Sequence, residues 1–370
     1  MENLVMQYLF SGIYKDKTVL VTGHTGFKGS WLVYWLKQMG AQVVGYALEA
    51  PTIPNHIELL NLDIISIVGD IRDLEKLDKT FATYKPDIVF HLAAQPLVRL
   101  SYENPIETYE TNVMGTLKVL EICKKHHVKA IVNITSDKAY ENKEWVWGYR
   151  ENDPMGGYDP YSSSKGCADL LVNSYRNSYF NVKEYKKSHH TLIASCRAGN
   201  VIGGGDWAQD RLMSDIMLCV SQGKKVSIRN PRATRPWQHV LEPLSGYLHV
   251  GQKLLEEQVE YGEAWNFGPS DEGSISVEEV VQHVKKHWDK IDYEIKKVDN
   301  QPHEANLLKL DCSKAHIKLH WKDVWDSEKT FEKTVKWYKS FYEHNKLLSE
   351  EDLQNYVQDA KEKNIEWTQK

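Results

Sequence analysis

The fold is decided by the stretch Thr22-Gly23-His24-Thr25-Gly26-Phe27-Lys28-Gly29, which follows the apolar run Thr18-Val19-Leu20-Val21. Glycines at three-residue intervals between a buried strand and an apolar-periodic helix predict a turn that holds a dinucleotide. Gly23 allows the tight turn, Gly26 lets the backbone approach a pyrophosphate, and Gly29 permits close packing of helix on strand. The N–H groups at the helix start would then face the phosphates. An ordinary glycine turn is the alternative, because this pattern alone is weak.

From this turn to Cys196, strand-like apolar runs alternate with helix-like segments. The predicted strands are residues 18–21, 42–46, 66–68, 88–92, 130–134 and 192–196. The predicted helices are residues 30–39, 74–84, 106–125 and 161–180. This alternation predicts an α/β fold, a doubly wound parallel sheet of the Rossmann type, in which ligands bind beyond the carboxyl ends of the strands.

After Cys196 the alternation ends, and a glycine run at 203–205 and scattered tryptophans replace it. Ser276 followed by Glu279 predicts a capping box that begins a helix at Val277. We expect a Rossmann domain and a smaller mixed α/β lobe that binds substrate, with a cleft between them. The expected boundaries are 14–196 with a return near 238–268 for the first domain, 197–237 and 269–345 for the second lobe, and 346–370 for a peripheral C-terminal tail.

The composition is that of an ordinary globular chain, with 41% hydrophobic and 26% charged residues and a net charge of -5. This mild acidity argues against an extended nucleic-acid-binding surface. The five cysteines are scattered and form no CxxC pair, which predicts a reducing compartment and no structural zinc or other metal. The first ten residues lack the basic region of a signal peptide, and no apolar run is long enough to span a bilayer. We therefore expect a cytoplasmic protein without nucleic-acid or membrane partners.

The fifth predicted strand runs directly into Thr135-Ser136-Asp137-Lys138. Four polar residues at the mouth of the expected cleft, two of them ionisable, are costly there unless they have a function. The alternative is a strand-ending turn in which Ser136 and Asp137 satisfy local backbone groups.

Tyr161 and Lys165 lie four residues apart at the start of a predicted helix, so they share a face. A lysine there lowers the pKa of the tyrosine by charge proximity and can also bond a nicotinamide ribose. The spacing alone is poor evidence, because it recurs at Tyr179, Tyr293 and Tyr342. Tyr161 differs from these in opening a helix after a glycine-proline loop, shortly after the polar strand end.

Together, the glycine turn, the polar strand end and the Tyr161–Lys165 pair resemble the extended, nucleotide-sugar-modifying form of the short-chain dehydrogenase/reductase family (the NAD-dependent epimerases and dehydratases). Longer segments are similar to CDP-glucose 4,6-dehydratases in particular. These segments are residues 22–29, 93–99, 112–116, 136–138, 147–151, 197–207 and 235–240. The resemblance weakens after about Asn345.

The resemblance implies that glucose C4 is oxidised by NAD, that water is eliminated across C5 and C6, and that the hydride returns at C6. Tyr161, assisted by Lys165 and Ser136, would take the proton of the 4-hydroxyl group. Asp137 would be the acid for the leaving hydroxyl. Lys138, where dTDP-glucose enzymes carry Glu, would be the base at C5. The acid must stay protonated and the lysine neutral, and burial of both groups together with the cation Lys165 would favour this.

NAD is the expected cofactor, because residues 43–47 carry no arginine for a 2′-phosphate. They also lack the usual acidic residue that bonds the adenosine ribose, so NAD is expected to be held less tightly than usual. The expected cofactor-binding residues are Gly23, His24, Thr25, Gly26, Phe27, Lys28, Gly29, Asp70, Ile71, Ala93, Ala94, Gln95, Asn112, Tyr161 and Lys165.

CDP-glucose is the expected substrate, and guanidinium groups suit its diphosphate. The expected substrate-binding residues are Arg99, Asn200, Arg211, Arg229 and Arg235. Each arginine could equally be a surface charge. A dehydratase or 4-epimerase acting on a GDP-, dTDP- or UDP-linked sugar stays open, as does a non-catalytic protein that retains the fold. The helices at 106–125 and 161–180 are apolar enough to pair across a homo-oligomer, a dimer or tetramer, or to be buried within one subunit.

Overall fold

The computed structural model describes residues 6–228, 230–269, 274–296 and 307–369. Within these residues a seven-stranded parallel sheet forms the centre, in the order β10-β6-β5-β4-β1-β2-β3. Its strands are β1 (Thr18–Thr22), β2 (Gln42–Ala47), β3 (Ile65–Val68), β4 (Ile88–His91), β5 (Ala130–Ile134), β6 (Leu192–Ala198) and β10 (Ala264–Phe267). The order reverses at β1 and β4, which confirms the doubly wound α/β fold.

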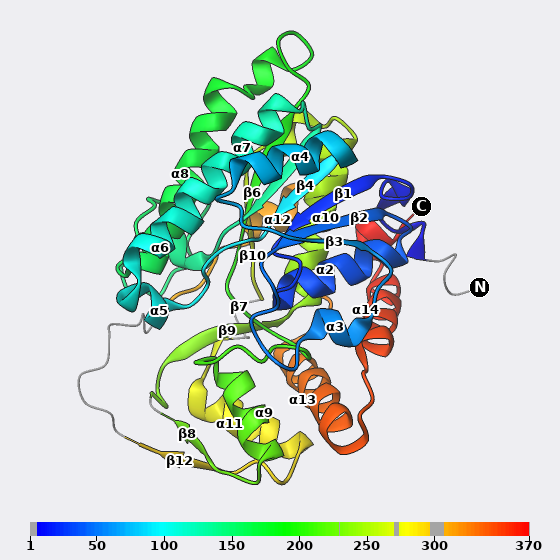
Figure 1. Cartoon of the computed structure of the whole chain (residues 1–370). Coiled ribbons are helices and arrows are strands. Elements are labelled where there is room, and N and C mark those ends of the chain that lie inside the picture. Colours follow the sequence, from blue (N-terminus) through cyan, green and yellow to red (C-terminus); the bar gives the residue numbers. More distant parts are fainter. Residues whose placement is uncertain (1–5, 229, 270–273, 297–306, 370) are drawn as a thin grey trace.

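Helices cover both faces of this sheet (Figure 1). One face carries α2 (Phe27–Gln38), α10 (Leu241–Leu255) and α14 (Ser349–Glu362), and the other carries α4 (Leu74–Tyr84), α7 (Thr116–Lys125) and α8 (Pro160–Ser178). Strand residues alternate between the two cores: Val19 and Val21 face the first, and Leu20 faces the second. Burial on both faces explains why these strands are continuous apolar runs.

The predicted helix at 106–125 is interrupted. It comprises α6 (Pro105–Tyr109), a π-helical turn η2 (Glu110–Gly115) and α7. Apolar periodicity does not reveal such a turn, because the chain stays helical through it. π-Helical turns occur frequently at functional sites, and this one contains Asn112.

The second lobe lies below the sheet in Figure 1. A small sheet in the order β11-β9-β7 joins the lobes, and β8 pairs with β12 farther out. The elements are β7 (Asn200–Ile202), α9 (Leu212–Ser221), β8 (Val226–Ile228), β9 (Thr234–His239), β11 (Ser274–Ser276), α11 (Val277–His287), β12 (Tyr293–Ile295) and α13 (Ser327–His344). The capping box predicted at Ser276 and Glu279 is confirmed.

The last residues, predicted to be a peripheral tail, are instead built into the core. Tyr356 of α14 and Trp367 are buried, and the Trp367 ring stacks on Phe10 with centroids 5.1 Å apart. Glu242 of α10 accepts hydrogen bonds from the Trp325 backbone N–H at 2.8 Å and the Tyr356 hydroxyl at 2.8 Å. The segment was expected to be peripheral because most of its residues are polar, and its few buried aromatic residues, such as Tyr356 and Trp367, give little sequence signal.

Three short helices complete the architecture: α3 (His56–Leu60), α5 (Val98–Glu103) and α12 (Ser313–Lys318). No helix in the described ranges combines the length and the apolar character needed to cross a bilayer. The same ranges contain no group of three or more His, Cys, Asp or Glu side chains that could hold a metal ion.

Candidate active site

The glycine turn between β1 and α2 is packed so tightly that side chains would not fit. Gly23 has a φ of +74°, and a Cβ at Gly29 would lie 2.1 Å from the Gly23 carbonyl oxygen. Gly26 is the N-cap of α2 and makes no side-chain capping hydrogen bond. The first N–H groups of α2 therefore have no side-chain cap, which is the arrangement that binds a phosphate at a helix start.

The other residues of the turn differ in what they contact. The His24 ring packs against Gly45 of β2, its Nε2 lies 2.7 Å from Ser66 Oγ, and burial lowers its pKa to about 4. Thr25 Oγ1 donates to the Leu48 carbonyl at 3.0 Å. The neutral His24 ring thus lies over Gly45, two residues before the end of β2.

Other expected cofactor-binding residues have polar partners within the protein. The Asp70 carboxylate is held by Arg72 at 2.6 Å, which lowers the pKa of Asp70, and Ile71 is buried. Asn112 accepts from the Gln95 N–H at 2.8 Å and donates to the Gln95 carbonyl at 3.1 Å and to Ser164 Oγ at 2.8 Å. Asn112 therefore ties the loop after β4, which includes Ala93 and Ala94, to α8.

The polar strand end and the tyrosine meet where β5 gives way to the short helix η3 (Asp137–Ala139). Ser136 Oγ donates to Asp137 Oδ1 at 3.0 Å, and Ser136 is also close enough to Tyr161 to lower the pKa of its phenol. Tyr161 lies in the first turn of α8, which Asp159 caps by accepting from the Ser162 N–H at 2.9 Å. Ser136, Asp137 and Tyr161 thus form one contiguous cluster.

Burial dominates the electrostatics of this cluster. It raises the pKa of Asp137, against the opposing charges of Lys138, Arg235 and Lys28. It raises the pKa of Tyr161 to about 12, against the Ser136 hydrogen bond and the nearby Arg211. A carboxyl group kept protonated is the form that can donate a proton near neutral pH.

Two buried ammonium groups flank the cluster. Burial lowers the pKa of Lys165 to about 8 against the charge of Asp169, and the Lys165 Nζ donates to the Ile134 carbonyl at 3.5 Å. Burial likewise lowers the pKa of Lys28 to about 8, with Arg211 and Lys165 lowering it further and Asp137 opposing them. Lys28, at the start of α2, is therefore influenced by the charges of the cluster that contains Asp137. Lys138 is half-buried.

A buried ion pair between Arg197 of β6 and Asp169 of α8 joins this helix to the central sheet. The Arg197 Nε donates to Asp169 Oδ2 at 3.0 Å, and both side chains are buried. Asp169 also accepts from Thr135 Oγ1 at 2.6 Å, while Arg197 donates to the Tyr140 hydroxyl at 2.6 Å. The network joins α8, β6 and the segment after β5, so it fixes Lys165 relative to η3.

The expected substrate-binding residues come from α5, from β7 and β9, and from the segment before α9. Arg99 of α5 forms an ion pair with Asp210 at 3.4 Å, and Arg211 forms one with Asp206 at 2.7 Å. The charge of Arg235 in β9 lowers the pKa of Asp137. Asn200 lies in β7, opposite Trp237 of β9 in the parallel pairing of these strands. Arg229 lies outside the described residues.

Three residues near the site were not singled out in the sequence. A Cβ at Gly199 would lie 3.1 Å from Asp137 Oδ2, so this glycine leaves room for the carboxyl group. Asp206 holds Arg211, and Tyr338 holds the Asp206 backbone. Asp206 has no clear sequence signal, because Asp210 lies nearer to Arg211 in the chain but pairs with Arg99 instead. Tyr338 lies 132 residues beyond Asp206, again with no local signal.

Solved structures with a similar fold include nucleotide-sugar epimerases. An epimerase from Methanothermobacter thermautotrophicus has a TM-score of 0.78 and 24% identity, covering 92% of this chain and 96% of its own. A UDP-glucose-4-epimerase from Stenotrophomonas maltophila, solved with bound NAD and formylated UDP-arabinopyranose, has a TM-score of 0.77 and 20% identity, covering 88% and 99%. At these identities the likeness establishes the fold.

Sequence comparison establishes the family. Residues 20–334 match the family described as GDP-mannose 4,6 dehydratase. The CDP-glucose 4,6-dehydratase of Salmonella typhimurium is 54% identical over 349 residues, which are 93% of this chain and 97% of that one. The dTDP-glucose 4,6-dehydratase of the same organism is 26% identical, over 86% and 92%. The chain therefore belongs to the GDP-mannose 4,6 dehydratase family, which confirms the membership among nucleotide-sugar epimerases and dehydratases that its sequence predicts.

Proposed function

We propose that this chain is an NAD-dependent CDP-glucose 4,6-dehydratase, a hydro-lyase that converts CDP-glucose to CDP-4-keto-6-deoxyglucose and water. The observation that carries this proposal is its 54% identity, over 93% of the chain, to an enzyme of that name. The contiguous cluster of Ser136, Asp137 and Tyr161 supports it, because dehydration needs an acid beside the group that moves the first proton.

The glycine turn fits the pyrophosphate of NAD, because Gly23 and Gly29 keep it free of side chains and α2 begins without a side-chain cap. When bound, NAD would supply the redox chemistry: its nicotinamide would accept the hydride from C4 of the sugar, and that hydride would later return at C6. The neutral His24 ring packs on Gly45 near the end of β2, and residues 43–47 contain no arginine that could hold the 2′-phosphate of NADP.

Tyr161 takes the proton of the sugar 4-hydroxyl group, and Ser136 assists by lowering the pKa of the Tyr161 phenol. Since burial raises the pKa of the phenol to about 12, cations near it are needed to make it an effective base. Lys165, one helical turn on, would bond the nicotinamide ribose, and the ion pair of Asp169 with Arg197 supports its helix.

For the elimination, Asp137 protonates the leaving 6-hydroxyl and Lys138 takes the proton at C5. Burial raises the pKa of Asp137, which favours the protonated form that a general acid needs. Arg99, Arg211, Arg235 and Asn200, together with Arg229, bind the nucleotide and its diphosphate.

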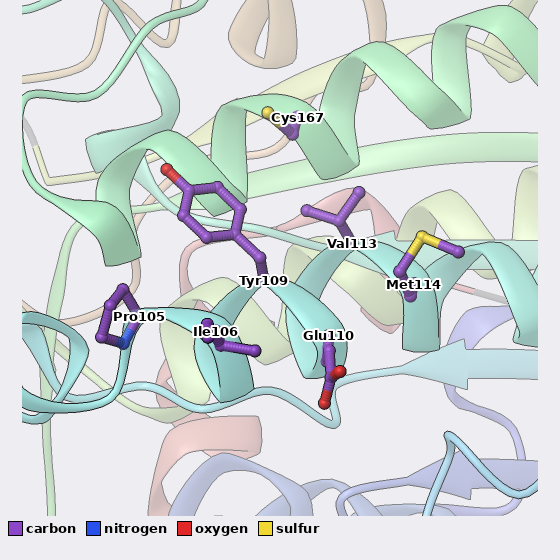
Figure 2. Close-up of a pocket in the computed structure, with 7 residues that line it drawn as sticks. All are labelled: Pro105, Ile106, Tyr109, Glu110, Val113, Met114 and Cys167. Carbon is purple, nitrogen blue, oxygen red and sulfur yellow. The ribbon is translucent and has the colours of Figure 1, made fainter.

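We also infer that the chain self-associates as a dimer or tetramer through an apolar patch on α6, η2 and α8 (Figure 2). Ile106 is 75% exposed and Met114 46% exposed, and Leu170 of α8 is 55% exposed. The residues that line the patch are Pro105, Ile106, Tyr109, Glu110, Val113, Met114 and Cys167. Apolar side chains gathered on adjacent helices favour a helix-to-helix interface between copies. Light scattering of the wild type and of Ile106→Lys tests this, since the variant is expected to have the smaller mass.

The function is tested by incubating the protein with NAD and, separately, with CDP-, dTDP-, UDP- and GDP-glucose. We expect the CDP-glucose reaction to give a 4-keto-6-deoxy product, which absorbs near-ultraviolet light in alkali. Faster conversion of another nucleotide sugar would overturn the substrate assignment. Formation of CDP-galactose without the keto product would overturn dehydration in favour of 4-epimerisation.

A further inference from the structure

The loop at residues 203–206 follows β7 of the second lobe, and two aromatic rings fill the space beside its glycines. The Trp337 ring of α13 lies 2.0 Å from an ideal Cβ at Gly204. The His56 ring of α3 lies 2.6 Å from an ideal Cβ at Gly205. The course of the loop therefore depends on where the Trp337 and His56 rings are held.

His56 and Trp337 are joined by a hydroxyl group of the C-terminal segment. Ser349, the first residue of α14, accepts from the Trp337 Nε1 at 2.9 Å, and its Oγ lies 2.8 Å from His56 Nε2. On the other side of the imidazole, His56 Nδ1 lies 2.9 Å from Ser30 Oγ of α2, and Ser30 donates to the Phe27 carbonyl at 2.8 Å. The four side chains that make these bonds are buried. A continuous hydrogen-bond path thus runs from α13 to the glycine turn.

The donors in this path all point the same way. A serine hydroxyl has one hydrogen, and Ser30 gives it to Phe27, so Ser30 accepts from the His56 Nδ1–H. Burial lowers the pKa of His56 to about 3, so the ring is neutral and its Nε2 accepts from the Ser349 hydroxyl. Removal of either serine hydroxyl therefore leaves its neighbours in the path one hydrogen bond short.

The α2 end of the path is anchored independently of it. α2 packs on the central sheet with Trp31 fully buried, and the glycine turn before it is too tight to admit a side chain. The loop is held by distant segments, among them Trp31, whose Nε1 donates to the Gly204 carbonyl at 2.8 Å. Because the loop lies between the proposed substrate-binding residues Asn200 and Arg211, loss of the path should displace those residues and leave the cofactor turn in place.

We propose that Ser349 and His56 are positioning residues, which hold the loop at residues 203–206 against the glycine turn and so set the affinity of the second lobe for the nucleotide sugar. This inference rests on the proposed function and names residues that act on the substrate site through the loop. It gives the C-terminal segment a part in the site, although Ser349 lies beyond residues 20–334, which match the family.

The test compares two buried serines that each accept from a tryptophan Nε1 at 2.9 Å. Ser349→Ala breaks the path. Ser245→Ala is the matched control, because Ser245 of α10 accepts from Trp321 and donates to the Glu242 carbonyl at 2.7 Å.

For Ser349→Ala we expect the KM for CDP-glucose, and the Kd for CDP measured by titration calorimetry, to rise about fivefold, the effect of one net hydrogen bond. NAD affinity is expected to match that of the wild type. Ser245→Ala is expected to keep the wild-type KM and Kd. Partial unfolding lowers kcat with the active fraction and leaves KM unchanged, so loss of stability cannot imitate this result. Equal KM values in Ser349→Ala and Ser245→Ala would overturn the proposal.

A double-mutant cycle tests whether the path acts as a unit. Ser30→Ala breaks the path at its α2 end, and because alanine favours a helix, this variant keeps the proposal testable if Ser349→Ala unfolds. We expect Ser30→Ala to raise the KM by a similar factor, and the double variant to show no further rise, because the path is already broken. A rise of about 25-fold in the double variant would show two independent local contacts and overturn the joint role.

Failure of this inference is distinguishable from failure of the proposed function. If the wild type converts CDP-glucose and the KM of Ser349→Ala equals that of Ser245→Ala, the positioning role is wrong and the function stands. If the wild type converts a different nucleotide sugar, the substrate assignment is wrong, and the KM comparison between the serine variants is made with that sugar.

Discussion

The glycine turn at residues 22–29 and the glycine loop at 203–206 both border the site, yet they are held in different ways. The turn is shaped largely by contacts within itself, since a Cβ at Gly29 would lie 2.1 Å from the Gly23 carbonyl oxygen, and its one distant neighbour at Gly23 is the Ala93 backbone after β4. The loop is shaped by Trp31, His56 and α13, which are more than 100 residues away along the chain. A glycine turn of this kind can thus be encoded mostly locally, whereas the placement of Arg211, which Asp206 of the second loop holds, depends on the assembled fold.

The largest effect is expected for Tyr161→Phe, which removes the proton-accepting hydroxyl and leaves both loops intact. We expect a loss of roughly a thousandfold in dehydration of CDP-glucose, because a positioned proton-transfer group contributes about 10²–10⁴-fold. NAD binding, measured by titration calorimetry, is expected to persist. Activity within tenfold of the wild type would remove Tyr161 from the mechanism.

Alanine at one glycine of each loop separates their roles. In Gly29→Ala the new Cβ meets the Gly23 carbonyl at 2.1 Å, and overpacking of this kind costs about 1–3 kcal/mol. We expect weaker NAD binding in this variant. In Gly204→Ala the Cβ meets the Trp337 ring, and we expect a raised KM for CDP-glucose with NAD affinity close to that of the wild type. Equal losses of NAD affinity in the two variants would break the distinction between the loops.

A smaller effect is expected at Gly199, which lies outside both loops and beside the Asp137 carboxyl group. Gly199 leaves 3.1 Å between an ideal Cβ and Asp137 Oδ2, so Gly199→Ala presses on the carboxyl group without entering the core. We expect kcat to fall about tenfold, equivalent to about 1.4 kcal/mol, with KM nearly unchanged. If kcat and the thermal unfolding temperature of Gly199→Ala both equal those of the wild type, the Asp137 carboxyl group can shift away from the new methyl group without loss, and Gly199 does not fix its position.

The smallest effect on catalysis is expected at Glu242, which joins α10 to the C-terminal segment. Burial raises the pKa of Glu242 from 4.5 to about 8, so the native state holds a proton that the unfolded state releases. Stability should therefore fall as pH rises between these values, by about 1.4 kcal/mol per unit at most from this group.

Glu242→Gln should flatten that decline in denaturant unfolding measured at pH 5, 6.5 and 8. The slope will not vanish, because burial also raises the pKa of Asp352 to about 7. A slope equal to that of the wild type would show that Glu242 is ionised in the native state throughout.

The parts of the fold that were predictable are those whose signal lies within one element. The strands beginning at Thr18, Gln42 and Ala130 were placed from unbroken apolar runs, and α4 from its periodicity. The π-helical turn at 110–115 was missed because it keeps the helical pattern, and the docking of α14 was missed because Tyr356 and Trp367 are sparse among polar residues.

The sequence by itself determined the parallel sheet, the glycine turn and the Tyr161–Lys165 face, because strand periodicity, backbone sterics and helical spacing act between residues near each other in the chain. The tertiary structure decided the ionisation of Asp137 and Tyr161 and the position of Arg211. Burial and Coulomb interactions depend on distances through space, and those distances were set by contacts such as Tyr338 to Asp206 that no local pattern encodes.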